Sequence, residues 1–252
     1  MSAPLRVEQH GSGIAEIVID RPERHNAMTM PMYDALLELI EQCCASSETR
    51  CIMLRGAGGK SFVSGTDIGY FADFSNGRQG VAYEALVERV VGAVERIALP
   101  TVAVIDGWAV GGGLALATAC DFRVCSASSR FGAPIAKTLS NTLSARNLAR
   151  LHAAFGTPRV KRMLMLAEFL GADEAHACGF VHSVCEQGTL AAQALALAQR
   201  LAGLSGVTQY AVKESLRRLV VEQRLDDEDL VEEVYGSAAF RDAVAAFTAA
   251  KS

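Results

Sequence analysis

The stretch that decides the fold is Thr101-Val102-Ala103-Val104-Ile105-Asp106-Gly107-Trp108-Ala109-Val110-Gly111-Gly112-Gly113. Its first five residues form a short apolar run typical of a buried strand, and the run Leu114 to Cys120 is typical of a helix. Glycines between the two allow a tight turn and a close approach of the backbone to a ligand. A helix that begins on glycine presents unpaired N–H groups at its positive end. The stretch therefore predicts a strand, a turn and a helix whose first amides face a bound group.

A second glycine-bearing stretch lies earlier in the chain. It reads Ser61-Phe62-Val63-Ser64-Gly65-Thr66-Asp67-Ile68 and follows the strand-like run Cys51-Ile52-Met53-Leu54. If the two loops meet, they aim two backbone N–H groups at one developing oxyanion. That arrangement suits acyl chemistry and needs no side chain.

The composition is that of an ordinary globular protein. The chain has 252 residues, of which 50% are hydrophobic and 21% charged, enough for one sizeable core with a smaller terminal subdomain. No apolar run reaches the ~18 residues of a membrane span. The N-terminus lacks the apolar core of a signal peptide, so a cytoplasmic location is expected. The net charge of −4, without a basic stripe, argues against a nucleic-acid partner.

The seven cysteines show neither a CxxC pair nor the spacing of Cys/His metal ligands. Since most of them lie in apolar surroundings, they are expected to be buried free thiols rather than disulfides or zinc ligands. No metal site is expected.

Apolar patterns alternate between strand and helix along most of the chain. Strands are predicted at 14–19, 51–54, 101–105, 122–125 and 181–184, and helices at 31–44, 81–97 and 114–120. Thr29 is expected to cap the first helix. The alternation predicts right-handed parallel crossovers and an α/β core. From residue 190 the pattern is helical only, at 190–204, 207–222, 227–235 and 238–250, so residues 1–190 are predicted as the core and 191–252 as a C-terminal helical region.

Four motifs, in order, resemble those of the enoyl-CoA hydratase/isomerase (crotonase) superfamily along nearly the whole chain. They are Arg21-Pro22 followed by Asn26-Ala27, Ser61 to Ile68, Gly107 to Gly113 followed by Cys120-Asp121, and Ala211-Val212-Lys213-Glu214-Ser215 with the terminal Phe240 and Ala246-Phe247. The resemblance implies an α/β spiral of βαβ units with a C-terminal helical trimerisation region. It also implies homotrimers that often pair into hexamers, and a coenzyme A thioester as substrate with no separate cofactor.

The resemblance also assigns roles to residues. The backbone N–H groups of Ser64 and Gly112 would form the oxyanion hole for an enolate oxygen. The residues expected to line the substrate and its CoA part are Arg24, His25, Ala27, Phe62, Gly65, Thr66, Asp67, Ile68, Gly111, Ala115, Pro134 and Ile135. At the tail, Phe247 and Lys251 are expected to reach the CoA site of a neighbouring subunit.

Two positions depart from the pattern of the family's hydratases, which use two glutamates. The first, three residues after the oxyanion-hole glycine and hence on the same helix face, is Ala115. The second, after Phe131-Gly132-Ala133-Pro134, is Ile135. Because neither side chain moves a proton, two-glutamate hydration is not expected.

The polar run after Ile135 offers replacements. In an alignment with the family's aryl-CoA dehalogenases, the nucleophilic aspartate falls at Asn141, which can orient water or a carbonyl but cannot act as that nucleophile. Ser140 and Ser144 are further candidates. The alternative is that this run caps a helix near Leu148. Asp73, Glu84 and Glu88 are candidate acids from a facing helix, or simply a solvated helix face.

Three functions follow from these patterns. The first is an enzyme that stabilises a CoA-thioester enolate, as an isomerase, a decarboxylase or another lyase. The second is a non-catalytic acyl-CoA-binding protein. The third, RNA binding through the first helix, is disfavoured because residues 31–48 contain four acids and no Lys or Arg.

Overall fold

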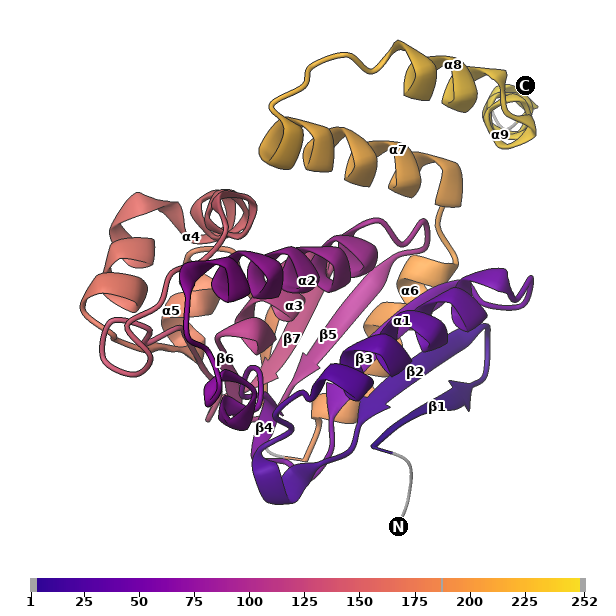
Figure 1. Ribbon diagram of the computed structural model, residues 1–252. Helices are drawn as coiled ribbons and strands as arrows, with labels where there is room; N and C mark the ends of the chain where they lie inside the picture. The colour runs from indigo at the N-terminus through magenta and orange to yellow at the C-terminus, as the bar shows by residue number, and fades with distance from the viewer. Residues whose placement is uncertain (1–3, 187, 250–252) are drawn as a thin grey trace.

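The computed structural model describes residues 4–186 and 188–249, which form two β-sheets and a set of covering helices (Figure 1). The larger sheet has the strand order β1-β2-β3-β5-β7-β10, and the smaller has the order β4-β6-β8-β9. The strands are β1 Leu5–His10, β2 Ile14–Ile19, β3 Cys51–Gly56, β4 Ser61–Val63, β5 Thr101–Ile105, β6 Trp108–Val110, β7 Phe122–Ser126, β8 Arg130–Gly132, β9 Leu170–Gly171 and β10 Ser183–Cys185. The α-helices are α1 Met30–Ala45, α2 Gly77–Glu95, α3 Gly112–Ala119, α4 Ala145–Met165, α5 Ala172–Ala177, α6 Leu190–Ala202, α7 Gly206–Arg217, α8 Glu228–Gly236 and α9 Ala238–Ala249.

The larger sheet is parallel from β2 to β10, and β1 adds to its edge in the antiparallel direction. Helices cover both of its faces: side chains of α1, α2 and α3 share one apolar cluster with one set of strand residues, and α6 packs on the other face. Because both faces are covered, strands such as β2 and β5 are buried at every residue and read as continuous apolar runs. The predicted α/β fold is confirmed.

The beginnings of α1 and α2 show what the apolar pattern misses. Thr29 occupies the N-cap position of α1, as predicted, but its side chain forms no capping hydrogen bond, so the expected cap was wrong in that respect. α2 begins at Gly77, ahead of the apolar stripe that predicted it. Its start is fixed by a capping box, in which Asn76 Oδ1 accepts from Arg78 N at 3.0 Å and Gln79 Oε1 accepts from Asn76 N at 3.2 Å.

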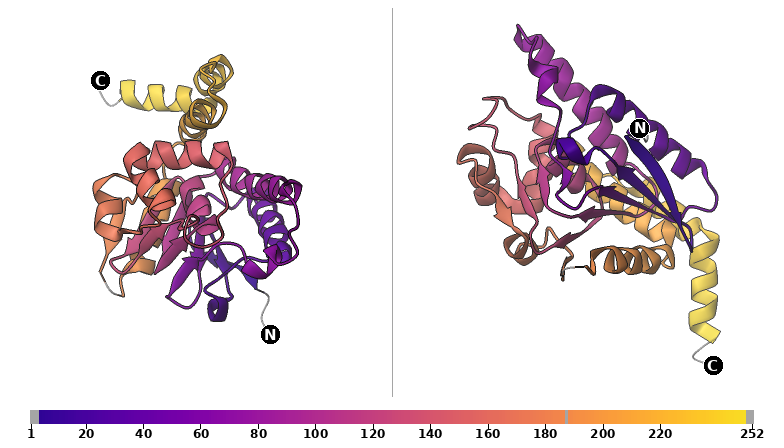
Figure 2. Two further views of the ribbon diagram at one scale, coloured as in Figure 1. Left: turned by 60° about the vertical axis from the view of Figure 1, so that its left-hand side comes forward. Right: turned by 90° about the horizontal axis from the view of Figure 1, so that it is seen from below.

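The helices α7, α8 and α9, hereafter the tail helices, project away from the core (Figures 1 and 2). Lys213 of α7 ties the first of them to the core by donating to Asp121 Oδ2 at 2.8 Å and to the Leu99 carbonyl at 3.2 Å. Much of their apolar surface is exposed, at Val212, Leu216, Val231, Tyr235, Phe240, Val244 and Phe247. Among the described residues, no helix combines the length and the apolar character required to cross a membrane.

The cysteines are free, as predicted: Cys43, Cys51, Cys120, Cys125 and Cys185 are buried, Cys178 is half-buried and Cys44 is exposed. Burial raises the pKa of the Cys51, Cys120 and Cys125 thiols to about 12. These thiols are therefore packing groups, protonated at neutral pH.

Candidate active site

The glycine loops meet because three parallel strands of the smaller sheet end at the same edge. β4 pairs with β6 through Val63 and Ala109, and β6 pairs with β8 through Val110 and Gly132. The residues that follow these strands therefore leave the sheet side by side: Ser64 and Gly65 from β4, Gly111 and Gly112 from β6, and Ala133, Pro134 and Ile135 from β8. Gly111 N–H donates to the Gly132 carbonyl at 3.0 Å, which joins two of the three loops.

Glycine is required where the first two loops touch. A Cβ on Gly65 would lie 3.6 Å from Gly112 N, and one on Gly113 would lie only 1.9 Å from the Val63 carbonyl oxygen. Gly65 and Gly111 have φ angles of 103° and 55°, in the left-handed region that favours glycine. The glycines that the sequence singled out for an approach to a ligand are thus required here for the close approach of two backbones.

A third loop, residues 21–28, is joined to the first by backbone hydrogen bonds. Met28 N–H donates to the Gly65 carbonyl at 2.8 Å, and Asp67 N–H donates to the Met28 carbonyl at 2.9 Å. The side-chain amide of the buried Asn26 fixes the loop by donating to the carbonyls of Ala57 at 2.9 Å and Ser61 at 2.7 Å. The Asn26 of the RPxxxNA motif is therefore a scaffold for this edge.

The two expected oxyanion donors differ in their surroundings. Gly112 is the first residue of α3, so its N–H is one of those that an α-helix leaves without an intrahelical partner. Ser64 N–H donates instead to the His25 carbonyl oxygen at 3.2 Å. An anion bound between the loops can accept a hydrogen bond from Ser64 N–H only if this N–H shares or gives up its bond to the His25 carbonyl.

Comparison with known proteins agrees with this geometry. The model of the family described as enoyl-CoA hydratase/isomerase matches residues 9–249. The chain belongs to the enoyl-CoA hydratase/isomerase family. It is 30% identical over 212 residues to the short-chain-enoyl-CoA hydratase of Clostridium acetobutylicum, covering 84% of this chain and 80% of that protein. It is 27% identical over 248 residues to the mitochondrial Delta(3,5)-Delta(2,4)-dienoyl-CoA isomerase of Dictyostelium discoideum, covering 94% and 83%.

Among solved structures, the crystal structure of an enoyl-CoA hydratase/carnithine racemase from Magnetospirillum magneticum is similar. It superposes with a TM-score of 0.88 at 30% identity, covering 99% of this chain and 94% of that one. The predicted membership of the enoyl-CoA hydratase/isomerase family and the crotonase fold are confirmed. The chain is thus a member of a family whose substrates are acyl-CoA thioesters.

The candidate acids of the second helix and the loop before it either form structural contacts or are exposed. Glu88 accepts two hydrogen bonds from the buried Arg150, at 2.7 and 2.8 Å, and Glu95 binds the same guanidinium. Glu84 is half-buried and accepts from Ser144 N–H at 2.7 Å; burial raises the pKa of its carboxyl. Asp73, which precedes α2, is exposed. The description of Glu84 and Glu88 as a solvated face was therefore wrong.

The polar run before α4 supplies a helix cap through one residue. Ser144 Oγ accepts a hydrogen bond from Asn147 N–H at 3.2 Å. Ser144 is thus the N-cap of α4, as the capping alternative predicted for this run. Ser140, with a φ of 53°, and Asn141 are exposed in the loop ahead of it. Asn141 and Ile135 line one cavity of about 660 Å³, together with Leu143, Leu148, His152 and Leu164.

The remaining expected site residues fall into three groups. Arg24, His25 and Ile68 are exposed near the loop edge, whereas the Phe62 side chain is fully buried in the core. Asp67 is held by Arg21, whose guanidinium donates at 2.7 Å and lowers the pKa of the Asp67 carboxyl. Phe247 is exposed on α9, away from the glycine loops of its own chain (Figure 1), and Lys251 lies outside the described residues.

Sequence reasoning missed a set of hydroxyl groups beside the glycine loops. Tyr33 Oη lies 2.8 Å from Thr66 Oγ1, which in turn lies 2.8 Å from Tyr83 Oη. A Cβ on Gly112 would lie 3.2 Å from Tyr33 Oη. Only Thr66 belongs to a recognisable motif; the two tyrosines sit within apolar helix patterns of α1 and α2, and the sequence carries no signal that joins them.

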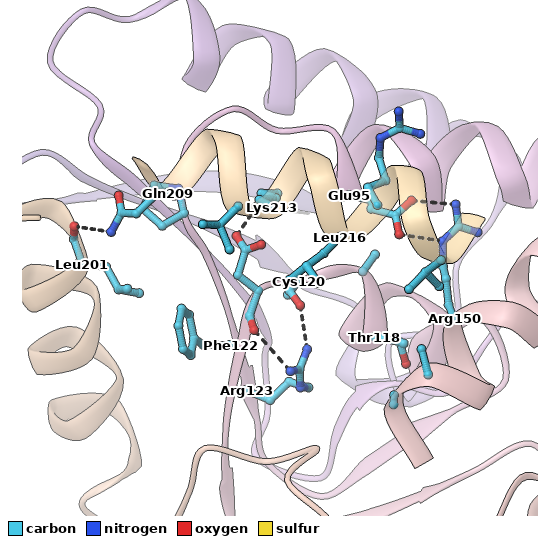
Figure 3. A pocket seen from close by; sticks show the side chains of 18 of the residues that line it. Glu95, Thr118, Cys120, Phe122, Arg123, Arg150, Leu201, Gln209, Lys213 and Leu216 are labelled. Carbon is cyan, nitrogen blue, oxygen red and sulfur yellow. Dashed lines mark hydrogen bonds and ion pairs between the residues drawn. The ribbon is translucent and has the colours of Figure 1, made fainter. Parts of the chain in front are cut away.

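A second cavity, of about 600 Å³, lies between α7 and the core (Figure 3). Leu201, Phe122, Val212 and Leu216 contribute its apolar lining, and Arg150 and Lys213 lie at its wall with their acidic partners. It contains none of the glycine-loop residues and is thus separate from the candidate active site.

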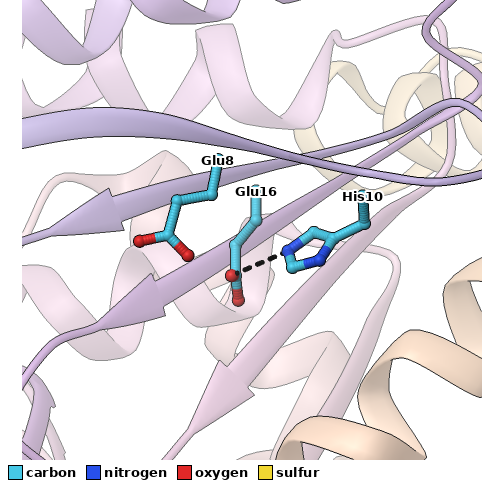
Figure 4. Close-up of side chains that lie close together, drawn as sticks. All are labelled: Glu8, His10 and Glu16. Atoms are coloured by element: carbon cyan, nitrogen blue, oxygen red, sulfur yellow. Dashed lines mark hydrogen bonds and ion pairs between the residues drawn. The ribbon is translucent and has the colours of Figure 1, made fainter.

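Within the described part of the chain, one cluster of potential metal ligands lies on the larger sheet. Glu8, His10 and Glu16 have ligand atoms within 4.8 Å of one another (Figure 4). Arg55 already donates to both carboxylates, at 2.9 Å to Glu16 and 3.3 Å to Glu8. The cluster is therefore explained as an ion-pair network that joins β1, β2 and β3.

Proposed function

We propose that this protein is an enzyme that acts on a CoA thioester by stabilising an enolate oxygen between the backbone N–H groups of Ser64 and Gly112. The observation that carries this proposal is the meeting of the two glycine loops at one sheet edge, with Gly112 N at the free start of α3. The Gly112 amide is arranged before the reaction begins, so it stabilises developing charge without reorganising. The Ser64 amide must first share or give up its hydrogen bond to the His25 carbonyl. The names of two relatives, a short-chain-enoyl-CoA hydratase and a dienoyl-CoA isomerase, agree with such an intermediate.

The proposed reaction is an isomerisation, a decarboxylation or another lyase step rather than two-glutamate hydration. Ala115 and Ile135 occupy the positions at which the family's hydratases carry glutamates, and neither exchanges protons. Decarboxylation needs mainly an oxyanion site and an apolar surface for the departing CO₂, which these two side chains supply. Asn141 and Ser140 remain proposed contacts of the acyl end of the substrate.

We further propose that the CoA part follows the joined loops of residues 21–28 and 64–68. Arg24 and His25 are exposed beside this edge, Ala27 lies next to Met28 in the paired backbone, and Ile68 exposes 65% of its surface. An arginine at that edge suits the phosphates of a nucleotide.

The tail helices are proposed to assemble the protein as a homotrimer or a pair of trimers, with residues 1–190 as the core and 191–252 as the helical region. Their exposed apolar residues support this, because a second copy of the chain would remove them from water. In that assembly Phe247 and Lys251 would reach a neighbouring CoA site.

Two observations favour a second function, that of a non-catalytic acyl-CoA-binding protein. The Ser64 N–H already donates to the His25 carbonyl, and the acid/base glutamates are absent. A chain with the binding loops and an incomplete set of catalytic donors would bind a thioester without converting it.

The two functions are separated by incubating the purified protein with crotonyl-CoA, a 3-enoyl-CoA and malonyl-CoA while following product formation and binding. Turnover is expected. Gly112→Pro removes the proposed N–H at a first helical position, where proline does least harm to the helix, and is expected to lower kcat by on the order of a hundredfold or more. Gly112→Ala is the matched control, because its Cβ would lie 3.2 Å from Tyr33 Oη as that of proline would, while the N–H is kept. Micromolar binding with no turnover of any of the three thioesters would favour the binding protein, and hydration as fast as in two-glutamate relatives would contradict the proposed reaction class.

A further inference from the structure

The cavity of about 660 Å³ opens beside the loop that follows β8. Its wall begins at Ile135, on a loop that leaves the smaller sheet next to Gly112. Backbone hydrogen bonds keep the shape of this loop: Lys137 N–H donates to the Pro134 carbonyl at 3.0 Å, and Ser140 N–H to the Ile135 carbonyl at 2.9 Å. A volume of this size is typical of sites for small molecules. A thioester held at the glycine loops therefore has the cavity beside its acyl end.

The opposite wall of the cavity comes from α4, which is bent. Gly156, with φ 71° and ψ 158°, interrupts the helix. Leu148 lies before this bend and Leu164 after it, and both line the cavity. In a straight helix the two would be separated by about 24 Å along the axis. The bend thus brings both halves of α4 to one space.

The cavity is apolar inside and polar at its mouth. Leu164 is buried, and Ile135, Leu148 and Val160 are half-buried. The polar side chains of the lining are all exposed; they are Asn141, Thr142, His152, Thr157 and Lys161. An occupant that fits this distribution is apolar along its length and polar at the end that reaches the mouth.

The charge at the mouth has one sign. Among the described residues that line the cavity none is Asp or Glu, although acids outnumber bases in the chain by 28 to 24. Two neighbours of Lys161 on α4 are paired, since Arg159 and Arg162 bind Glu174 at 3.3 and 2.7 Å. The Lys161 side chain, by contrast, forms no ion pair within the described part of the chain. His152 adds a ring N–H, which an imidazole offers whether it is neutral or charged. These groups complement an anion.

We propose that this cavity takes the acyl chain of the thioester, and that Lys161 and His152 bind a carboxylate at the far end of that chain. The preferred substrates are then CoA thioesters of dicarboxylic acids. This inference rests on the proposed function, because the glycine loops must hold the thioester end. Lys161 and His152 take no part in bond making or breaking here; they select the substrate.

The test is a binding measurement and does not depend on turnover. Isothermal titration calorimetry on the full-length protein compares adipoyl-CoA with hexanoyl-CoA, and octanedioyl-CoA with octanoyl-CoA. Each pair has equal carbon number and differs in the terminal carboxylate. In at least one pair we expect the Kd of the dicarboxylic thioester to be lower by on the order of tenfold, because hydrogen bonds to a charged partner are the stronger ones.

Variants of Lys161 test where the preference comes from. Lys161→Met keeps a long apolar side chain without the charge, and should lose most of the preference while it binds the monocarboxylic thioesters as the wild type does. Lys161→Glu should invert the preference, since like charges then meet at the mouth. Because Lys161 is exposed, neither change removes a buried contact. His152→Phe keeps an aromatic ring without its N–H and should lose a smaller part of the preference.

Lys137→Met is the matched control, because Lys137 is exposed on the same loop as Ile135 but does not line the cavity. It should keep the wild-type preference. Loss of the preference in this variant as large as in Lys161→Met would overturn the assignment, because it would indicate a diffuse effect of charge.

The outcomes distinguish this inference from the proposed function. Equal Kd values within both pairs for the wild-type protein would overturn the carboxylate site and leave the proposed function standing. The same holds if Lys161→Met weakens both members of a pair equally, since Lys161 would then contact the CoA part. A wild-type protein that binds none of the four thioesters would contradict the proposed function and this inference with it.

Discussion

The glycine-loop edge and the tail helices are held together in opposite ways. At the edge, backbones touch: a methyl group at residue 113 would lie 1.9 Å from a carbonyl oxygen, and successive amides bond across loops. In the tail, α8 and α9 contribute little buried surface, and Leu225 and Phe247 remain 81% and 64% exposed. The comparison indicates that the edge is held by contacts within one chain, whereas the tail leaves an apolar face exposed.

The largest expected effect tests the close contact at the edge. Gly113→Ala places a Cβ against the Val63 carbonyl oxygen. Because this contact involves the backbone of β4 and of α3, it can be relieved only by shifting one of these elements. We expect the free energy of unfolding to fall by about 3 kcal/mol, measured by urea denaturation.

Gly206→Ala is the matched change in the tail. No atom lies within 4 Å of the added methyl group at the start of α7. The free energy of unfolding should change by less than about 1 kcal/mol. Equal losses from the two substitutions would remove the contrast between edge and tail.

A second prediction concerns the exposed face of the tail. Val231 on α8 is 48% exposed, and Val231→Glu would place a charge in the proposed contact between copies. We expect analytical ultracentrifugation at micromolar concentration to show trimers or hexamers for the wild-type protein and mostly smaller species for the variant, because burying an unpaired charge is costly.

The control for this prediction is Glu233→Gln, an exposed position on the same helix, which should keep the wild-type mass. A monomeric wild-type protein at tens of micromolar would contradict the proposed assembly through the tail face.

The smallest effect concerns the acid sensitivity of the tail. Hydrogen bonds from Arg217, and from Arg218, lower the pKa of Glu214 from 4.5 to about 2. Because the folded value is depressed, this carboxylate stabilises α7 fully above pH 4.5, and its contribution is lost as the pH falls toward 2. The difference in stability between wild type and Glu214→Gln should therefore be constant above pH 4.5 and shrink below it.

Thermal unfolding followed over a series of pH values measures this difference. Glu232→Gln, an exposed substitution on α8, should show no such dependence relative to the wild type. A difference for Glu214→Gln that grows on acidification would reverse the sign and refute the assignment.

Much of the fold was predictable because its signals are local. The runs of β2, β3 and β5 are apolar at nearly every position, and that pattern by itself indicates strands buried on both faces. The short strands β4, β6 and β8 were not predicted as a sheet, because three residues carry no period and their pairing joins segments far apart in the chain. Trp108 of β6 illustrates the limit: it is 41% exposed and meets Phe169, a contact between segments far apart in the chain that no local pattern indicates.

The sequence by itself determined where glycine leaves the backbone without a side chain, and at which two positions the glutamates of the family's hydratases are absent. Glycines at 65 and 112 and the residues Ala115 and Ile135 are properties of the chain at single positions, so no folding was needed to read them. Only the tertiary structure decided what surrounds them: that Ser64 N–H meets the His25 carbonyl, and that Tyr33 and Tyr83 reach Thr66 from two different helices. Such contacts depend on distances between elements remote in sequence, and a residue pattern carries no measure of those distances.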